Sequence, residues 1–273
     1  MSRVDLHTHT TASDGTLEPA DLFQKAIELQ LRVLAISDHD STAGFEAVRP
    51  LQARHPGLRL IPAIELNAEG EFACHLLGYF IDPADSDFQA RLESFRALRR
   101  SRVRAMTEKL QALGMKIDFN RVLELSKGGS VGRPHLADAL MEKGYVKTRQ
   151  EAFDRFLKKD GPAYLGSGTP GAAEAIRLIR RVGGIPVLAH PSYYFTESLL
   201  KALLDSGLMG IEVYYPDYSR SLIQRYLELA RAHDLVVTGG SDFHGPRTGR
   251  AALACVEVPE SVVEDLEKAR ARA

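Results

Sequence analysis

The sequence predicts an α/β protein with a mostly parallel sheet or barrel that is interrupted by a helical insertion. Three observations support this prediction. Short apolar runs alternate with segments of helical spacing in both the N-terminal and the C-terminal part of the chain. The segment of about 84–164 lacks that alternation and consists mainly of helical patterns. A length of 273 residues suffices to bury the core of one large domain that carries such an insertion.

The N-terminal part of the chain contains four predicted strands and two predicted helices. The strands are the apolar runs 3–9, 32–37, 58–66 and 75–81. The segment after the first run has helical spacing, and Pro19 stands at a first-turn position, where a proline is tolerated. A second helix is predicted near 43–53. Such β-then-α steps are typical of parallel sheets and barrels.

The same alternation resumes after the insertion. Its predicted elements are, in chain order, helix 170–182, strand 184–190, helix 196–206, strand 210–215, helix 219–233 and strand 235–240. We therefore assign residues 1–100 and 165–273 to a discontinuous barrel, and residues 101–164 to the helical insertion.

The first helix of the middle segment, about 86–113, carries arginines that face inward. Its apolar residues recur every 3.6 positions: Phe88, Leu92, Phe95, Val103, Met106, Leu110 and Leu113. At about 100° per residue, Arg99 falls in the centre of this apolar stripe and Arg102 at its edge. Because a buried arginine needs an anion, we predict an anion-binding site at these two residues. Three further arginines are interpreted as a solvated face: Arg91, Arg96 and Arg104.

Composition and charge exclude several classes of protein. The 35 Lys and Arg residues nearly balance the 36 Asp and Glu residues, so the formal charge of −1 provides no basic field that attracts nucleic acid or an anionic membrane. The two cysteines cannot form a disulfide framework. No charged-then-apolar leader and no apolar run of about 18 residues is present. We expect a soluble, cytoplasmic protein with no membrane contact and no evident protein partner.

Side chains that can bind metals collect at or just past the ends of the predicted strands. They are His7, His9, His39, Glu65, His190, Asp242 and His244. His75 instead opens a strand. In a parallel barrel the strand ends share one rim, where active sites are built. Imidazole nitrogens suit zinc, manganese and iron, and a carboxylate such as Glu65 can bridge two ions, so we predict a metal site at this rim.

A metal site of this kind permits hydrolysis without a nucleophilic side chain. Bound ions lower the pKa of a bridging water from about 16 towards about 7, and they neutralise phosphoryl oxygens. The sequence accordingly contains no Walker loop and no CxxC motif. Together these observations favour metal-dependent hydrolysis of a phosphoester.

Each motif also has a structural explanation when it is taken alone. The histidine pair in 7–9 can end a strand, residues 37–40 can form a turn or a helix cap, and residues 132–135 can begin a helix. Glu65 is harder to explain in this way, because an unpaired carboxylate at the end of an apolar run is costly to bury. The combination of these motifs along one rim favours the metal site.

Seven short segments resemble the motifs of the polymerase and histidinol phosphatase (PHP) superfamily of metal-dependent phosphoesterases. They are DLHTHTTASDG, LAISDHD, IPAIEL, HLLGY, GRPH, LAHP and GGSDFH. The resemblance covers nearly the whole chain. It implies a distorted barrel of seven β/α units with an inserted helical subdomain. It also implies a site for three divalent metal ions, with manganese expected first and iron or zinc as alternatives.

The same resemblance assigns ligands to each ion. His7, His9, Glu65 and Asp242 would hold the first ion; Glu65, His75 and His135 the second; and Asp14, His39 and His244 the third. His190 would be either a further ligand or a group that contacts the substrate. Every ligand position of the motifs is present, which argues against a non-catalytic PHP module.

Within the superfamily the chain most resembles stand-alone enzymes that hydrolyse 3′,5′-bisphosphonucleotides, for example adenosine 3′,5′-bisphosphate to AMP. Some of these enzymes are also 5′-to-3′ exoribonucleases on short RNA. The resemblance implies that the nucleotide is contacted by Asp40, Arg99, Arg100, Ser101, Arg102 and Arg133. A metal-activated hydroxide would attack phosphorus, with Asp40 and His190 as the catalytic side chains.

Two other functions remain open from the sequence. A histidinol-phosphate phosphatase would share the fold and the metals. Its substrate carries only one phosphate, however, and so has no second phosphate for the inward arginines to bind. A non-catalytic module would use its metals to stabilise the fold or a partner interface.

A group of tyrosines near the C-terminal strands also has two interpretations. Its members are Tyr193, Tyr194, Tyr214, Tyr215 and Tyr218. These rings could stack on a base, and packing in the core or on the rim explains them equally well.

Overall fold

The computed structural model describes residues 3–166, 168–246, 248 and 251–272. Over these residues seven strands form one sheet, in which neighbouring strands follow chain order. The strands are β1 (Val4–Asp5), β2 (Val33–Ile36), β3 (Arg59–Ala68), β4 (Cys74–Tyr79), β5 (Ile185–Leu188), β6 (Gly210–Tyr214) and β7 (Val236–Gly239). Each of them lies within, or overlaps, one of the seven predicted strands.

The sheet is mostly parallel and curls until its two edges meet. β1 pairs with β2, β2 with β3, β5 with β6, and β6 with β7 in parallel. At the closure, the amide of Leu6 donates to the carbonyl oxygen of Gly239 at 3.3 Å, and Thr8 and Phe243 form a parallel bridge. The predicted α/β fold with a distorted barrel is thus confirmed.

β4 is the exception, because it runs antiparallel to both β3 and β5. Its first residues therefore lie at the rim where the parallel strands end. His75, the second residue of β4, pairs in register with Asn67 near the end of β3. The reversal brings His75 to the same rim as the histidines that follow strand ends.

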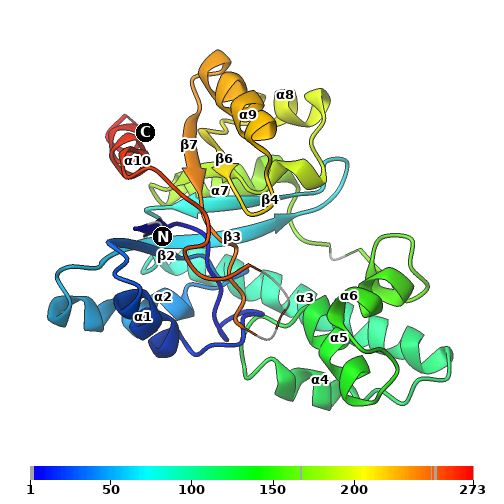
Figure 1. Cartoon of the computed structure of the whole chain (residues 1–273). Coiled ribbons are helices and arrows are strands. Elements are labelled where there is room, and N and C mark those ends of the chain that lie inside the picture. Colours follow the sequence, from blue (N-terminus) through cyan, green and yellow to red (C-terminus); the bar gives the residue numbers. More distant parts are fainter. Residues whose placement is uncertain (1–2, 167, 247, 249–250, 273) are drawn as a thin grey trace.

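Helices flank the curled sheet (Figure 1). They are α1 (Pro19–Glu28), α2 (Ala43–Val48), α7 (Ala172–Arg181), α8 (Glu197–Asp205), α9 (Arg220–Ala232) and α10 (Ser261–Arg270). The helix predicted near 43–53 consists of α2 and a 3-10 helix, Arg49–Arg54. Pro50 has no N–H group with which to continue α-helical bonding. α10 lies beyond the last predicted element and packs against β5 and β7.

The middle segment forms α3 (Ser86–Ala112), α4 (Phe119–Leu125), α5 (Arg133–Glu142) and α6 (Arg149–Ala152). Figure 1 shows α4, α5 and α6 beside the curled sheet. The first half of α3 adds Phe88 and Phe95 to an apolar cluster shared with β3 and β4, and its second half adds Val103 and Met106 to a separate cluster around α4 and α5. One helix thus serves both clusters, and the division of the chain near residues 100 and 165 stays a prediction.

None of the helices in the described part of the chain is both long and apolar enough to cross a membrane. The 27-residue helix α3 carries six arginines between residues 91 and 104. Its length serves instead to connect the sheet with the helical segment.

Candidate metal centre

The side chains expected to bind metals meet at one end of the curled sheet. They come from the segments that follow β1, β2 and β7, and from β3 and β4 themselves. Their ligand atoms form three overlapping groups, and all atoms of a group lie within 4.8 Å of one another. The groups are His7, His9, Glu65 and Asp242; His9, Asp14, His39 and His244; and His39, Glu65 and His75.

The first group has the spacing of ligands around a metal ion. Nε2 of His7 lies 3.3 Å from Glu65 Oε2 and 3.3 Å from Asp242 Oδ1. Nε2 of His9 lies 3.2 Å from the same two oxygen atoms. A tetrahedral ion with ligands at about 2.0–2.2 Å holds its ligand atoms roughly 3.3–3.6 Å apart. The structure thus brings together the four residues assigned to the first ion.

The other two groups share residues with the first. His39 Nδ1 lies 3.2 Å from Glu65 Oε2, and His75 Nδ1 lies 2.8 Å from Glu65 Oε1. His244 Nε2 lies 3.3 Å from Asp14 Oδ1. Glu65 therefore presents different oxygen atoms to different histidines, as a carboxylate that bridges two ions does.

These donor atoms fit divalent cations better than they fit a hydrogen-bond network. His9 Nε2, Asp14 Oδ1 and His39 Nδ1 are buried and form no hydrogen bond of good geometry. Each nevertheless lies 3.2–3.3 Å from a potential partner across the centre. Buried polar atoms without a partner are costly, and a metal ion between them removes that cost. Mixed imidazole and carboxylate ligands suit manganese, iron and zinc.

The electrostatics of the centre also requires positive charge. Burial alone would lower the pKa of His7, but attraction to Glu212 and Asp242 holds this pKa well above its usual value. Burial opposes the charge of His9 too, yet contacts with Asp242 and Glu65 raise its pKa to about 9. Burial would raise the pKa of Glu65, but the neighbouring histidines hold it well below its usual range. The carboxylates therefore stay ionised, and either protons or metal ions must balance them.

His135 belongs to none of the three groups formed by the described residues. It is the third residue of α5, and its Nδ1 atom accepts a hydrogen bond from the amide of Gly132 at 3.0 Å. Burial lowers its pKa, and Asp14 is the neighbour that opposes this effect most. The resemblance places His135 beside Glu65 and His75, but the group that contains these two residues in the structure is completed by His39. The ligand role of His135 stays a prediction.

His190 contacts the centre from the end of β5. Its Nε2 atom lies 3.0 Å from Glu65 Oε1. Its backbone φ is 25°, a strained value for a residue other than glycine, and its amide donates to Glu212 Oε2 at 2.7 Å. This position is compatible with both predicted roles, metal ligand and substrate contact.

Glu212 in β6 is a residue of the centre that the sequence did not single out. It is fully buried, and its Oε1 atom accepts a hydrogen bond from Nδ1 of His7 at 3.0 Å. Because Nδ1 of His7 donates this bond, its Nε2 atom is the one that would bind a metal ion held between Glu65 and Asp242. Glu212 lies inside the apolar run GIEVYY. The argument that pointed to Glu65, that an unpaired carboxylate in an apolar run is costly to bury, applies to Glu212 as well.

The substitution Glu212→Gln is expected to weaken metal binding by about 10- to 100-fold. Its amide can accept one hydrogen bond through oxygen, but its NH₂ group opposes the second donor, either His7 or the amide of His190. A titration of the metal-depleted protein with manganese against a competing chelator measures the effect. The surface variant Glu260→Gln serves as the control, and an unchanged affinity of Glu212→Gln would contradict the role assigned to Glu212.

The inward arginines of α3 lie beside the metal centre. Arg99 donates from Nε to Asp40 Oδ2 at 2.5 Å, and its side chain is 7% exposed. Asp40 directly follows His39, so this ion pair adjoins the centre. Arg102 is equally buried and donates to the carbonyl oxygen of Leu165 at 2.8 Å. The Nη2 atoms of both arginines are buried without a hydrogen-bond partner.

Arg133, the first residue of α5, adds a third positive charge. Burial, followed by the charge of Arg133, lowers the pKa of Arg102 to about 10. Burial also lowers the pKa of Arg133 itself, and Arg99 contributes to that shift. Oε1 of Glu69 lies 3.5 Å from Nη1 of Arg102. We call Arg99, Arg102 and Arg133 the arginine cluster, and its crowded charges favour the binding of an anion.

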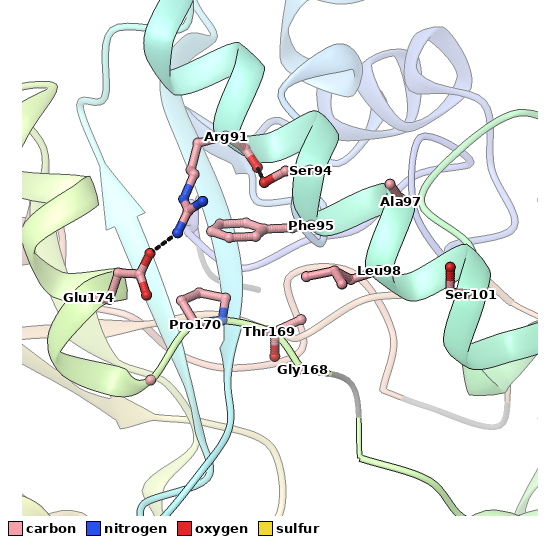
Figure 2. A pocket seen from close by; sticks show the side chains of 11 residues that line it. Arg91, Ser94, Phe95, Ala97, Leu98, Ser101, Gly168, Thr169, Pro170 and Glu174 are labelled. Atoms are coloured by element: carbon pink, nitrogen blue, oxygen red, sulfur yellow. Dashed lines mark hydrogen bonds and ion pairs between the residues drawn. The ribbon is translucent and has the colours of Figure 1, made fainter.

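Arg100 and Ser101 face away from the arginine cluster. The Arg100 side chain is 45% exposed and bonds to Glu93 at 2.7 Å. Ser101 lines a cavity of about 440 Å³ between α3 and the segment 168–171, which includes Thr169 and Pro170 (Figure 2). The structure does not bring these two residues to the metal centre, and their contact with a nucleotide stays a prediction.

The arginines interpreted as a solvated face differ among themselves. Arg91 pairs with Glu174 (Figure 2), and Arg104 stacks on the ring of Phe119. Arg96 instead donates from Nη1 to the carbonyl oxygen of Asp40 at 2.9 Å. Its long side chain reaches round the helix, so helical spacing alone did not reveal this contact.

Comparison with known proteins gives one family. The family model described as PHP domain matches residues 5–162. Among curated proteins, the chain is 31% identical to the 3′,5′-nucleoside bisphosphate phosphatase of Chromobacterium violaceum, over 91% of this chain and 90% of that protein. It is 35% identical to the 5′-3′ exoribonuclease Rnm of Salmonella typhimurium, over 89% of this chain and 85% of that protein.

Two further matches extend this comparison. The chain is 32% identical to the phosphoribosyl 1,2-cyclic phosphate 1,2-diphosphodiesterase of Eggerthella lenta, over 93% of this chain and 98% of that protein. A solved structure from Bifidobacterium adolescentis, described as a proposed metal-dependent phosphoesterase, superposes with a TM-score of 0.89 at 32% identity. That superposition covers 98% of this chain and 96% of the other.

Proposed function

The chain belongs to the PHP domain family and is a metal-dependent phosphoesterase, and from this premise we propose that its substrate is a 3′,5′-bisphosphonucleotide. The reaction removes one phosphate, for example converting adenosine 3′,5′-bisphosphate to AMP. Three divalent ions are proposed for the centre, with manganese first and iron or zinc as alternatives. The overlap of the three ligand groups supports this number.

The observation that carries this proposal is the arginine cluster beside the metal centre. The buried Nη2 atoms of Arg99 and Arg102 lack hydrogen-bond partners. Arg99 also pairs with Asp40, the residue that directly follows His39 of the metal centre. Guanidinium groups match phosphate oxygens through a planar fork of N–H donors. A substrate with two phosphates supplies one to the metals and one to the arginines. Histidinol phosphate has a single phosphate and would leave the arginine cluster unused.

Residues of this chain would bind and orient the substrate. The arginine cluster holds the phosphate that does not react, and Asp40 fixes the guanidinium of Arg99. Divalent ions bound at the centre would supply a hydroxide at neutral pH and neutralise the phosphoryl oxygens. His190, whose Nε2 atom lies 3.0 Å from Glu65 Oε1, would give a proton to the leaving oxygen.

We also propose exonuclease action on short RNA, which the same geometry would accommodate. A 5′-phosphorylated RNA carries a 5′-phosphate and, on the 3′ oxygen of its first nucleotide, a second phosphate at the same spacing as in a 3′,5′-bisphosphonucleotide. The exoribonuclease of Salmonella typhimurium resembles this chain as closely as the bisphosphate phosphatase does. The formal charge of −1 argues against tight binding of long RNA, because each phosphate contact needs a cation.

A panel of substrates tests the proposal on metal-replete protein. It compares adenosine 3′,5′-bisphosphate, 5′-AMP, histidinol phosphate and a short 5′-phosphorylated RNA, with phosphate and nucleotide release as readouts. We expect kcat/KM for the bisphosphate to exceed that for 5′-AMP by about 100-fold, because only the bisphosphate engages the arginine cluster. A preference for histidinol phosphate would replace the proposed substrate. Inactivity on all four compounds would favour a non-catalytic module.

A further inference from the structure

We propose that Tyr193 is a stacking platform for the nucleobase of the substrate. This inference rests on the proposed function and deepens it. The metal centre and the arginine cluster recognise phosphate groups, and neither recognises a base. Tyr193 would supply that recognition.

The structure separates Tyr193 from the other tyrosines that could contact a base. Tyr194 donates its hydroxyl hydrogen bond to the carbonyl oxygen of Ala189. Tyr215 donates to Asp242 Oδ2 at 2.7 Å, and the hydroxyl of Tyr218 accepts from the amide of Ser192 at 3.1 Å. Tyr214 packs against the apolar clusters of the sheet. Tyr193 is 69% exposed, the largest exposed fraction among the large apolar side chains described as exposed.

Tyr193 stands directly beside the metal centre. It ends the short 3-10 helix Pro191–Tyr193, which follows His190. Its ring meets the His190 ring at a centroid distance of 5.3 Å and the Tyr215 ring edge-on at 6.1 Å. One residue, His190, therefore separates this exposed ring from the Glu65 carboxylate.

Packing holds the Tyr193 ring while leaving most of it open to solvent. Besides its two ring contacts, its hydroxyl lies 3.5 Å from the hydroxyl of Tyr215. The backbone is fixed by the strained His190, whose amide bonds to Glu212. Little side-chain freedom is left for a ligand to remove, so a flat ligand binds at a small entropic cost.

The arginine cluster and Tyr193 flank the metal centre from different elements. Arg99 reaches it from α3 through Asp40, next to His39. The His75 ring lies between the two sides, 5.4 Å from the His39 ring and 5.0 Å from the His190 ring. A substrate that offers a phosphate to Arg99 and lies across the centre extends its remaining part toward Tyr193. In a nucleotide, that part includes an aromatic base.

Stacking on one tyrosine does not distinguish bases, because every base has a π face. The proposal therefore predicts that a base is required for tight binding and that its identity has little effect. It also predicts that Tyr193 acts on binding rather than on the chemical step, since the base is remote from the reacting phosphorus. A loss should then appear in KM and leave kcat largely unchanged.

The test compares two ligands that differ by the base, AMP and ribose 5-phosphate, on metal-loaded protein. Calorimetric titration gives the Kd of each for the wild type, Tyr193→Ala, Tyr193→Phe and the control Leu113→Ala, which alters an exposed residue just past the end of α3. We expect Tyr193→Ala to weaken AMP by about 10- to 100-fold. Ribose 5-phosphate should change about 2-fold at most, and Tyr193→Phe should bind AMP as the wild type does. GMP, CMP and UMP should follow AMP.

Equal weakening of both ligands in Tyr193→Ala, or no weakening of AMP, overturns the stacking role. Failure of the wild type to bind AMP overturns it as well. The proposed function is judged separately. If the wild type binds AMP but hydrolyses no bisphosphonucleotide, that function is wrong, and the Kd comparison still decides the role of Tyr193. If adenosine 3′,5′-bisphosphate is hydrolysed and the Kd for AMP is unaffected by Tyr193→Ala, only the stacking role is wrong.

Discussion

The substitution Glu65→Gln is expected to lower kcat by about 1,000-fold or more, which corresponds to roughly 4 kcal/mol of transition-state stabilisation. Oε2 of Glu65 lies 3.2–3.3 Å from nitrogen atoms of His7, His9 and His39. Oε1 lies 2.8 Å from His75. Glutamine has the same shape but only one oxygen and no charge, so it cannot bridge two cations.

The measurement pairs the rate of hydrolysis with the metal content of the same preparation. We expect Glu65→Gln to lose bound metal together with activity, because two of the ligand groups contain Glu65. The variant Glu228→Gln on the exposed side of α9 makes the same chemical change outside the centre and should behave as the wild type. Full metal content with full activity in Glu65→Gln would show that this carboxylate does not bridge metals.

The substitution Arg99→Ala is expected to reduce kcat/KM for adenosine 3′,5′-bisphosphate by about 100- to 1,000-fold, while an aryl phosphate loses only a few-fold. Arg99 is buried, and its Nη2 atom has no hydrogen-bond partner. A phosphate bound there receives charge-assisted hydrogen bonds, whereas an aryl phosphate has no second phosphate to bind. Arg99→Lys keeps the charge but loses the planar fork, so an intermediate loss is expected.

Two controls separate this effect from damage to the fold. Removing Arg99 leaves Asp40 as an uncompensated buried charge, and this can destabilise the protein. Activity on the aryl phosphate reports the folded fraction in the same sample. Arg104→Ala removes an exposed arginine from the same helix and should affect neither substrate. Equal losses of Arg99→Ala on both substrates would contradict the binding of a second phosphate.

Local patterns in the sequence were sufficient to predict the fold and the rim of candidate ligands. Strand ends are visible in a sequence because apolar runs stop there, and parallel topology brings those ends together. The direction of β4 was not predicted, since hydrophobic pattern does not determine whether a strand runs parallel or antiparallel. That direction explains why His75 opens its strand and still reaches the centre.

Tertiary packing decides the details of the site that the sequence could not give. The group that contains Asp14, His39 and His244 also includes His9. Glu65 and His75 form a group with His39, where His135 was expected. Such choices depend on distances of a few ångströms between loops that are far apart in the chain. Helical spacing placed Arg99 and Arg102 inward correctly, because it describes Cβ directions. It missed the Arg96 contact with Asp40, because a long side chain can bend away from its Cβ direction.

The most direct test of the central claim is the rate of phosphate release from adenosine 3′,5′-bisphosphate relative to 5′-AMP, before and after chelation. Metal-replete protein should favour the bisphosphate by about 100-fold, chelation should abolish both rates, and manganese should restore them. This result requires both a metal centre and a second phosphate site. Equal rates on the two nucleotides, or full activity in metal-free protein, would contradict it.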